Sequence, residues 1–360
     1  MPLLGLECKK EHPKSKRVGY FWTAVCLLIG VGSVAGCSQS AVMPNTLDPQ
    51  GPGAARIADL WWLMLALGAG VYLIVMGLLV WALWRKRPNE GTGSGPPAAD
   101  PSNRGTKSRS QRLIIGGGVV FPAVILSIVF GFTLHTLSDL NGMRGDDPLV
   151  IEVIGYQWWW EINYPDQGFV TANEIHIPVG EAVQFRLIAA DVIHSFWVPE
   201  LHGKLDLVPG QTNTLWLEAD EPGEYRGLCA EFCGIQHAKM LFIVVAEPRE
   251  AFENWLAGQQ EPAPQPVGEL AQQGLAVFTG AGCNECHTIR GTAANGELGP
   301  DLTHFASRLT LGSGVFPNNR DYLARWVLNP HDLKEGNLMP ATSLSDPELE
   351  ALLAYLESLR

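Results

Sequence analysis

Charged side chains are scarce in this sequence, at 17% of its 360 residues, whereas hydrophobic residues make up 46%. This composition argues against an ordinary soluble protein and predicts membrane-spanning segments. Basic residues are scarcest after residue 138, where 31 acidic and 12 basic side chains give a local net charge of −19. This deficit disfavours nucleic acid as a ligand and favours a basic partner.

The sequence also lacks the even number of cysteines that a plain disulfide framework requires, since it has seven. Four of them form two closely spaced pairs, Cys229 with Cys233 and Cys283 with Cys286. Cys37 follows a stretch of small residues, and Cys8 and Cys26 have no evident role. The spacing therefore indicates two chemical sites rather than covalent stapling.

Residues 1–37 have the layout of a secretory signal sequence. Basic residues precede the mostly apolar segment Tyr20–Val34, and small residues lead to Cys37. The segment is similar to a bacterial lipoprotein signal, in which the cysteine is lipidated and becomes the mature N-terminus. The alternative is a third membrane helix, but about 15 residues are short for a span that needs roughly 20.

Two long apolar runs, Ile57–Trp84 and Leu113–Leu137, predict a transmembrane hairpin over residues 57–138. The loop between them, residues 85–112, carries seven basic side chains against two acidic ones and is rich in Gly, Pro and Ser. Because positively charged loops stay in the cytoplasm, the rest of the chain after the hairpin is expected outside.

The outer part predicts two domains joined by a linker. β-branched and aromatic runs separated by turn signals indicate an antiparallel sandwich or barrel over residues 139–248. The runs are Leu149–Ile154, Ala182–Ile188, Val192–Val198, Thr212–Leu217 and Met240–Val245. A linker is expected over 249–267, in which the prolines would extend the stretch 259–266. The segment 268–360 has helical patterns at Gly268–Phe278, Arg320–Leu328 and Asp346–Leu359, with Ser345 or Asp346 as a cap for the last.

The first predicted site lies in the segment Cys229–Met240, which contains two thiols, the imidazole of His237 and a thioether. His194 offers a second imidazole from an upstream strand. Soft sulfur ligands with imidazole suit copper, and two thiolates can bridge two copper ions. The alternative is a disulfide with two ordinary histidines, which leaves the joint spacing unexplained.

The pattern Cys-x-Glu-x-Cys-x-x-x-His-x-x-Met, with an upstream His-Ser-Phe, resembles the binuclear CuA site of cytochrome c oxidase subunit II. The resemblance covers roughly residues 57–246 and implies a cupredoxin-like fold. It also implies roles for individual residues. Cys229 and Cys233 would bridge both copper ions, and His194, His237 and Met240 would complete the ligand shells. Glu231 would give its carbonyl to copper and its carboxylate to a magnesium ion shared with subunit I, and Trp158, in the run Gln157–Glu161, would be the point where electrons enter.

The second site is Cys283-Asn-Glu-Cys286-His287, whose spacing is typical of covalent haem c attachment with the histidine as an iron ligand. The alternatives, a thioredoxin-like redox pair or half of a zinc site, lack their sequence context. The region 268–359 resembles one-haem cytochromes c, which implies Met339 as the sixth ligand. His304 and His331 are its competitors.

Together the resemblances imply a membrane-anchored multidomain protein with a two-helix hairpin, an all-β cupredoxin-like domain and an all-α cytochrome c domain. They imply an electron-input subunit of a bacterial cytochrome c oxidase, multi-pass in the cell membrane with both redox domains on its outer face. Electrons would come from a cytochrome c or another donor, through haem c and CuA, to subunit I, which reduces oxygen with proton pumping; subunit III would be a further partner. The alternatives are the CuA subunit of a nitric oxide reductase and a free-standing membrane-anchored carrier. The intact copper ligands argue against a quinol oxidase.

Overall fold

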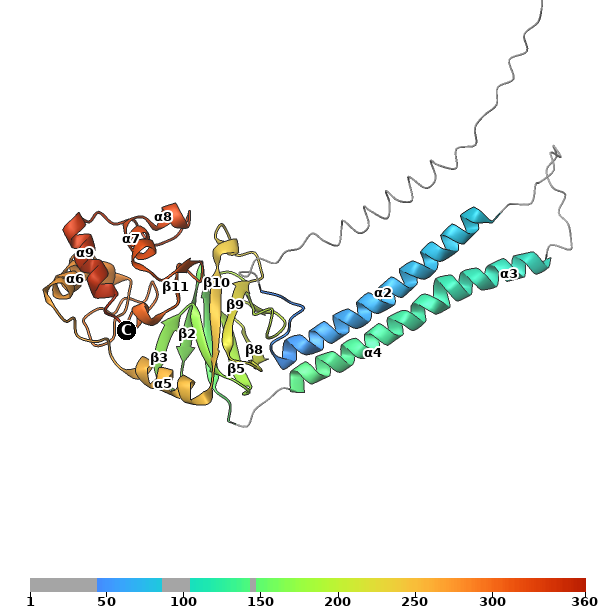
Figure 1. Ribbon diagram of the computed structural model, residues 1–360, viewed down its shortest axis with the longest axis horizontal. Coiled ribbons are helices and arrows are strands. Elements are labelled where there is room, and N and C mark those ends of the chain that lie inside the picture. Colours follow the sequence, from blue (N-terminus) through green and yellow to red (C-terminus); the bar gives the residue numbers. More distant parts are fainter. Residues whose placement is uncertain (1–43, 86–103, 143–146) are drawn as a thin grey trace, which may run out of the picture. The chain divides into compact units, whose positions relative to one another are not determined.

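A computed structural model describes residues 44–85, 104–142 and 147–360 of the chain (Figure 1). The predicted signal segment, with Cys8, Cys26 and Cys37, lies outside these residues. The described parts comprise two long apolar helical stretches, a β-sandwich and a helical domain, so the predicted fold class is confirmed.

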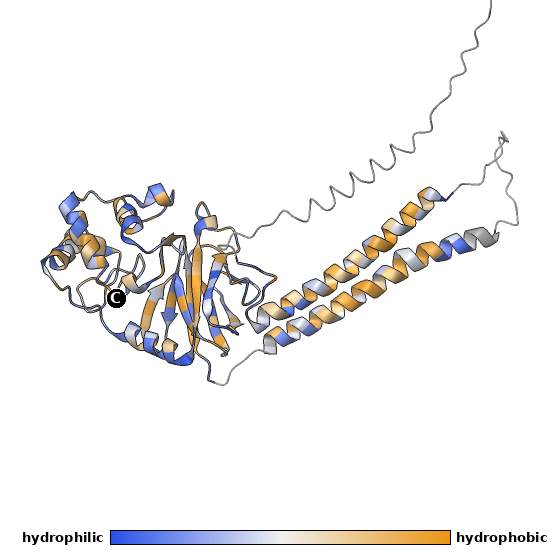
Figure 2. Cartoon of the chain, viewed as in Figure 1, coloured by the Kyte–Doolittle hydropathy of each residue, from blue (hydrophilic) through white to orange (hydrophobic). Residues whose placement is uncertain are grey.

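The membrane hairpin consists of α2 (Pro52–Trp84) and a second helical stretch made of α3 (Arg104–Ile115), a π-helical segment η2 (Gly116–Val120) and α4 (Phe121–Gly142). Pro52–Trp84 and Arg109–Leu140 are each long and apolar enough to cross a bilayer. Figure 2 shows apolar residues along both α2 and α4.

Two features of the hairpin go beyond the sequence prediction. Residues 104–112 of the predicted loop are helical, because Lys, Arg and Gln are good helix formers and extend the second span past its apolar part. An ion pair between Arg56 and Asp139 joins the first turns of α2 to the last turns of α4. The two helices contact each other along this antiparallel arrangement.

The start of α2 is attached to the β-sandwich through its backbone. The amide of Gln50 donates to the carbonyl of Glu200 at 2.7 Å, and that of Ala54 donates to Leu201 at 3.0 Å. Gly53 permits this approach, because a Cβ there would lie 2.2 Å from the His202 ring. Amide groups that a helix start leaves without partners are thus satisfied by the sandwich.

The β-sandwich has two five-stranded sheets, in the orders β3-β2-β1-β5-β8 and β4-β10-β9-β6-β7. Their strands are β1 (Val150–Tyr156), β2 (Trp159–Tyr164), β3 (Phe169–Ala172), β4 (Glu174–Pro178), β5 (Val183–Ala189), β6 (His194–Trp197), β7 (Leu205–Leu207), β8 (Thr212–Leu217), β9 (Gly223–Cys229) and β10 (Leu241–Glu247). The expectation of an antiparallel sandwich is wrong in one respect, since β1 pairs with β5 and β4 pairs with β10 in parallel.

The sandwich core is aromatic at its centre. The ring centroids of Trp160 and Phe242 lie 5.2 Å apart, those of Phe196 and Phe242 lie 4.5 Å apart, and all three side chains are fully buried. Such pairs add to the free energy gained from burial alone. Strands β2, β6 and β10, which carry these three side chains, are therefore packed together at the centre of the core.

The predicted linker over 249–267 is not extended throughout. Its first part forms α5 (Arg249–Gln260), which buries Phe252 and packs Trp255 against the sandwich core. The residues from 261 to 268 have no regular structure, as their prolines favour. The helix was missed because its large apolar side chains, Phe252, Trp255 and Leu256, are too few for a clear helical pattern.

The helical domain is built on α6 (Glu269–Gly280) packed against α9 (Asp346–Leu356). A Cβ at Gly274 would lie 2.0 Å from the Ala351 carbonyl, so the close approach of the two helices requires glycine. Ser345 is the N-cap of α9, and its amide donates to the Glu348 carboxylate at 2.8 Å. The remaining elements are the 3-10 turns η4 (Cys283–Glu285) and η5 (Phe305–Ser307), the short strands β11 (Thr310–Leu311) and β12 (Phe316–Pro317), and the helices α7 (Arg320–Leu328) and α8 (Pro330–Leu333).

A buried histidine is held between two carboxylates where β4 meets β10. His176 Nε2 lies 3.1 Å from Glu174 Oε1, its Nδ1 lies 2.9 Å from Glu247 Oε2, and its ring stacks on Trp255 at 4.0 Å. Burial by itself lowers the pKa of His176, but the hydrogen bonds and charges of the two carboxylates raise that pKa by more, above its ordinary value of 6.5. The imidazolium is therefore the form that stabilises the fold.

We expect His176→Gln to lower the unfolding midpoint of the outer domains more at pH 6 than at pH 9. The raised pKa gives a stabilisation that is complete below pH 6.5 and is lost as the pH rises through the folded value. The loss at low pH should be about 1.5–3 kcal/mol, the range for hydrogen bonds to charged groups. Thermal unfolding of the detergent-solubilised chain checks this, with His331→Gln at an exposed position as the control. An equal loss at both pH values would contradict the assignment.

Candidate metal centres

The two thiols of the first site lie in the thiol loop, residues 229–240, which runs from the last residue of β9 to the start of β10. Cys229 ends β9, Cys233 follows in the loop, and their Sγ atoms lie 3.8 Å apart as free thiols. The 3-10 turn η3 (His237–Lys239) then places His237 Nδ1 at 3.8 Å from Cys233 Sγ. Met240 is fully buried, with its Sδ at 3.7 Å from the same sulfur. The loop therefore gathers four of the predicted ligands.

The remaining imidazole comes from β6, the strand that pairs with β9. Register places Phe196 opposite Cys229, and His194 Nδ1 lies 4.0 Å from Cys229 Sγ. The carbonyl of Glu231 lies 3.2 Å from the same sulfur. The ligand atoms of His194, Cys229 and Cys233 all lie within 4.8 Å of one another, as a metal-binding group requires. Each sulfur thus has one imidazole beside it.

The chemistry of this cluster fits a pair of soft cations. Hydrogen bonds from Cys233 and then His194 lower the pKa of Cys229 to about 3. The hydrogen bond and charge of Cys229 in turn raise the pKa of Cys233, because two adjacent thiolates repel. Both sulfurs can ionise together only when positive charge lies between them. Two thiolates, two imidazoles and a thioether are the ligand types that copper prefers.

Asp191 orients the buried imidazole, and sequence reasoning missed it. Its Oδ1 lies 2.8 Å from His194 Nε2, which leaves Nδ1 directed at the sulfurs. Its Oδ2 accepts a hydrogen bond from the backbone amide of Gln157 at 2.6 Å. A carboxylate behind a metal-bound histidine fixes the ring orientation and raises its basicity. An Asp three residues before the histidine is the signal that could have identified it.

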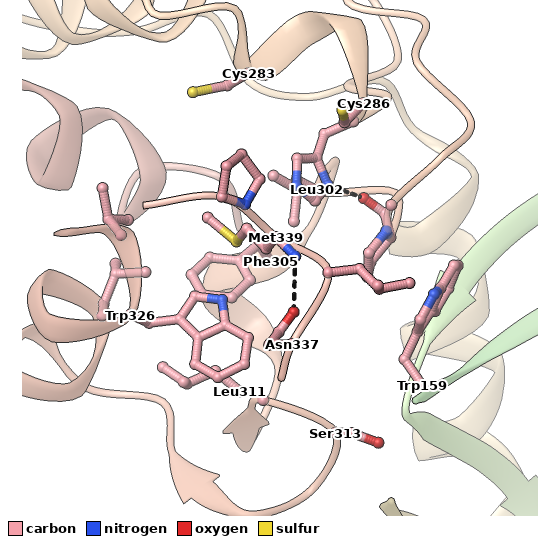
Figure 3. A pocket seen from close by; sticks show the side chains of 18 of the residues that line it. Trp159, Cys283, Cys286, Leu302, Phe305, Leu311, Ser313, Trp326, Asn337 and Met339 are labelled. Carbon is pink, nitrogen blue, oxygen red and sulfur yellow. Dashed lines mark hydrogen bonds between the residues drawn. The ribbon is translucent and has the colours of Figure 1, made fainter. Parts of the chain in front are cut away.

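The three consecutive tryptophans, residues 158–160, have three different surroundings. Trp158 Nε1 donates to the Cys233 carbonyl at 2.9 Å, and the Gln157 side chain donates to the same oxygen at 2.7 Å. Trp159 stacks on Tyr156 with centroids 4.8 Å apart and lines the second site (Figure 3). Trp160 is fully buried in the sandwich core. Trp158 therefore contacts the backbone of the loop that carries Cys233.

The second site is a cavity of about 470 Å³ lined mainly by the helical domain (Figure 3). Cys283 and Cys286 lie at its edge, on and just after η4. His287 Nδ1 donates to the Pro300 carbonyl at 2.7 Å, which leaves Nε2 as the ring nitrogen available to iron. Burial and then the charge of Arg308 lower the pKa of His287, so the ring stays neutral as an iron ligand must. These features fit a covalently attached haem.

Met339 lines the same cavity, whereas its two competitors do not. The amide of Met339 donates to Asn337 Oδ1 at 2.8 Å, which fixes the loop that carries the thioether (Figure 3). His304 Nε2 donates to the Glu261 carbonyl at 3.0 Å, away from the cavity lining. His331 is exposed on α8. The geometry thus favours Met339 over both histidines.

One wall of the cavity belongs to the β-sandwich. Gln157, Trp158 and Trp159 from the strand β1–β2 region and Gln236 from the thiol loop all line it. Two of these side chains, Gln157 and Trp158, also hold the Cys233 carbonyl. The wall of the second site is therefore built partly from residues that support the first.

Comparison with known families identifies two regions. Residues 167–247 match the family described as "Cytochrome C oxidase subunit II, periplasmic domain", and residues 271–360 match the family "Cytochrome c". Among solved structures, the periplasmic domain of subunit II of the cytochrome oxidase of Bradyrhizobium japonicum is similar, with 30% identity and a TM-score of 0.32. The match covers 33% of this chain and 96% of the chain in that structure.

Curated relatives extend the similarity over most of the chain. Cytochrome c oxidase subunit 2 of Alkalihalophilus pseudofirmus is 38% identical over 324 residues, which are 88% of this chain and 91% of the relative. The Bacillus subtilis subunit 2 is 35% identical over 67% of this chain and 73% of its own length. Together with the clustered His, Cys and Met side chains, these matches show that the chain belongs to the cytochrome c oxidase subunit II family and carries a fused cytochrome c domain.

Proposed function

We propose that this chain is the electron-input subunit of an oxygen-reducing haem–copper oxidase, with a copper pair and a covalent haem on its outer domains. The main observation behind this proposal is the cluster in which the sulfurs of Cys229 and Cys233 lie 3.8 Å apart and each faces one imidazole. A blue-copper ion uses one thiolate with two imidazoles, so a second thiolate with its own histidine supports a pair of ions.

The copper ions would be held by the residues of the thiol loop and β6. Cys229 and Cys233 would bridge them, and His194 and His237 would each complete one ion. Met240 and the Glu231 carbonyl would add weaker ligands. Copper supplies one-electron redox chemistry, and the protein residues fix its geometry and keep water away: Met240 and His194 are fully buried. The carboxylate of Glu231 is exposed and thus available for the proposed magnesium ion shared with a partner subunit.

The haem would be bound by thioether bonds to Cys283 and Cys286, with His287 and Met339 as axial ligands. When bound it also supplies one-electron chemistry, at a potential that His/Met ligation raises. Trp158 contacts the Cys233 backbone and lines the haem cavity, and this position supports its proposed role in electron input.

The membrane orientation and the partners follow from charge and from the family. The seven basic side chains between residues 85 and 112 support a cytoplasmic loop, with the sandwich and helical domains on the outer face of a bacterial cell membrane. The chain is part of a haem–copper oxidase complex. We propose subunits I and III as its membrane partners and a basic cytochrome c as donor, which the net charge of −19 after residue 138 would attract.

The function is tested on the purified complex by measuring turnover with oxygen and with nitric oxide. The oxidase proposal predicts donor-dependent oxygen consumption and a copurifying haem–copper subunit. Nitric oxide turnover without oxygen turnover would instead support a nitric oxide reductase, and purification without any such partner would support a free-standing carrier.

We expect Cys229→Ser and Cys233→Ser, alone or together, to abolish the mixed-valence copper spectrum and leave haem c in place. Both sulfurs belong to one ligand cluster and lie 3.8 Å apart, so neither can be spared, whereas the haem would be bound in a separate domain. Copper analysis and electron paramagnetic resonance check this. Ser195→Ala is the matched control, because its buried hydroxyl has no hydrogen-bond partner. A mixed-valence signal that survives in the double variant would exclude the assignment.

We expect Met339→Ala to lower the haem reduction potential and to disturb the low-spin spectrum, because a thioether ligand favours the ferrous state. Potentiometric titration followed by haem absorbance measures both. His304→Gln and His331→Gln should leave the spectrum unchanged. If either histidine variant changes the spectrum and Met339→Ala does not, the sixth ligand has been wrongly assigned.

A further inference from the structure

The loop that leads to Met339 is bound to the loop that carries the copper ligands. Lys239 Nζ donates to the Leu333 carbonyl at 3.0 Å, and the Gln236 side chain donates to the Glu335 carbonyl. Gly336 lies against Ile235, at φ +78, where a Cβ would come within 3.0 Å of that side chain. Residues 333–336 of the helical domain therefore contact the segment between Cys233 and Met240.

Lys334 lies at the centre of this contact and is only 2% exposed. Its Nζ donates to the Lys239 carbonyl at 2.8 Å and to the Gly312 carbonyl at 3.1 Å, and the Trp158 carbonyl lies at 3.5 Å. Two of these acceptors belong to the β-sandwich and one to the helical domain. An ammonium group has three donors, so one side chain can join three separate backbone segments.

This arrangement is costly for a charged group. Among the described residues, no carboxylate lies within ion-pair distance of Lys334, and only carbonyl dipoles face it. Burial, followed by the charge of Lys239, lowers the pKa of Lys334 to about 7. A methionine or leucine would fill such a position at lower cost. A buried lysine here is thus explained better by geometric specificity than by stability.

We propose that Lys334 is a positioning residue that fixes the haem-binding domain against the copper-binding domain. It joins the loop that carries Met339 to the loop that carries His237 and Met240, and to the strand segment that carries Trp158. This inference rests on the proposed function, because it assigns the fixed geometry to electron transfer between the two centres. The copper and haem ligands themselves do not include Lys334.

Two hydrogen bonds between the domains, each donated by a backbone amide, report on this role directly. The Leu241 amide donates to the Ser313 carbonyl at 3.0 Å, and the Leu309 amide donates to Glu174 Oε2 at 2.8 Å. Both amides exchange with solvent only when the domains separate, whereas amides in the β1–β5 pair report on the sandwich alone.

The test uses Lys334→Met in the intact, metal-loaded complex, with Lys204→Met at an exposed position as the matched control. Amide exchange at Leu241 and Leu309 should accelerate roughly tenfold or more, as expected from losing hydrogen bonds to a charged donor. Electron transfer from photoreduced haem c to copper should slow about tenfold, because small misplacements of reacting groups are costly. The copper and haem spectra and both reduction potentials should stay unchanged, and Lys334→Arg should restore part of the exchange protection.

Unchanged exchange and unchanged transfer in Lys334→Met would overturn the proposal. So would a lost copper or haem spectrum, because Lys334 would then build a metal centre rather than position one. Lys334→Gln keeps two donors and gives the same comparison if the methionine variant does not fold. If the unmodified complex transfers no electron from haem to copper, the proposed function fails instead, whatever the exchange rates show.

Discussion

Two ionisable sulfurs held 3.8 Å apart on one short loop impose the main physical constraint on this protein. Adjacent thiolates repel, so the loop is stable with both ionised only when cations lie between them. The sandwich supplies what such a loop cannot provide by itself. β6 pairs with β9 and places His194 Nδ1 at 4.0 Å from Cys229 Sγ, Asp191 orients that ring, and both strands pack on the aromatic core. The ligand geometry is therefore set by strand register before any metal binds.

The haem-binding domain makes a second use of the same scaffold. Gln157 and Trp158 hold the Cys233 carbonyl and also line the haem cavity, so support for one centre forms a wall of the other. The backbone contacts of residues 309–314 and 333–336 with the sandwich extend this connection. Electron transfer between two centres on one chain depends on their relative position, and the proposed role of the buried Lys334 side chain is to fix that position.

The sequence predicted those features that depend on local pattern. Apolar length identified the hairpin, and ligand spacing identified the thiol loop and the Cys283–His287 motif. Five strands were readable from β-branched runs. Others, such as β4 and β9, were not, because buried Glu174 and His176 break the apolar pattern of one and Gly223, Glu224 and Arg226 that of the other. The parallel pairing of β1 with β5 could not be predicted, because it depends on how segments far apart in the sequence pack together. The role of Lys334 could not be predicted either, because its three acceptor carbonyls lie far from it in the sequence.

The central claim is that one chain carries a copper pair and a haem in electronic contact. The most direct measurement is a copper and covalent-haem count per chain on the purified complex, combined with the order in which the two centres are reduced after a single electron is delivered to the haem. The account predicts two copper ions and one covalent haem per chain, with haem reduced first and copper next. A single copper ion per chain, or copper that is reduced without the haem having been reduced before it, would contradict the account.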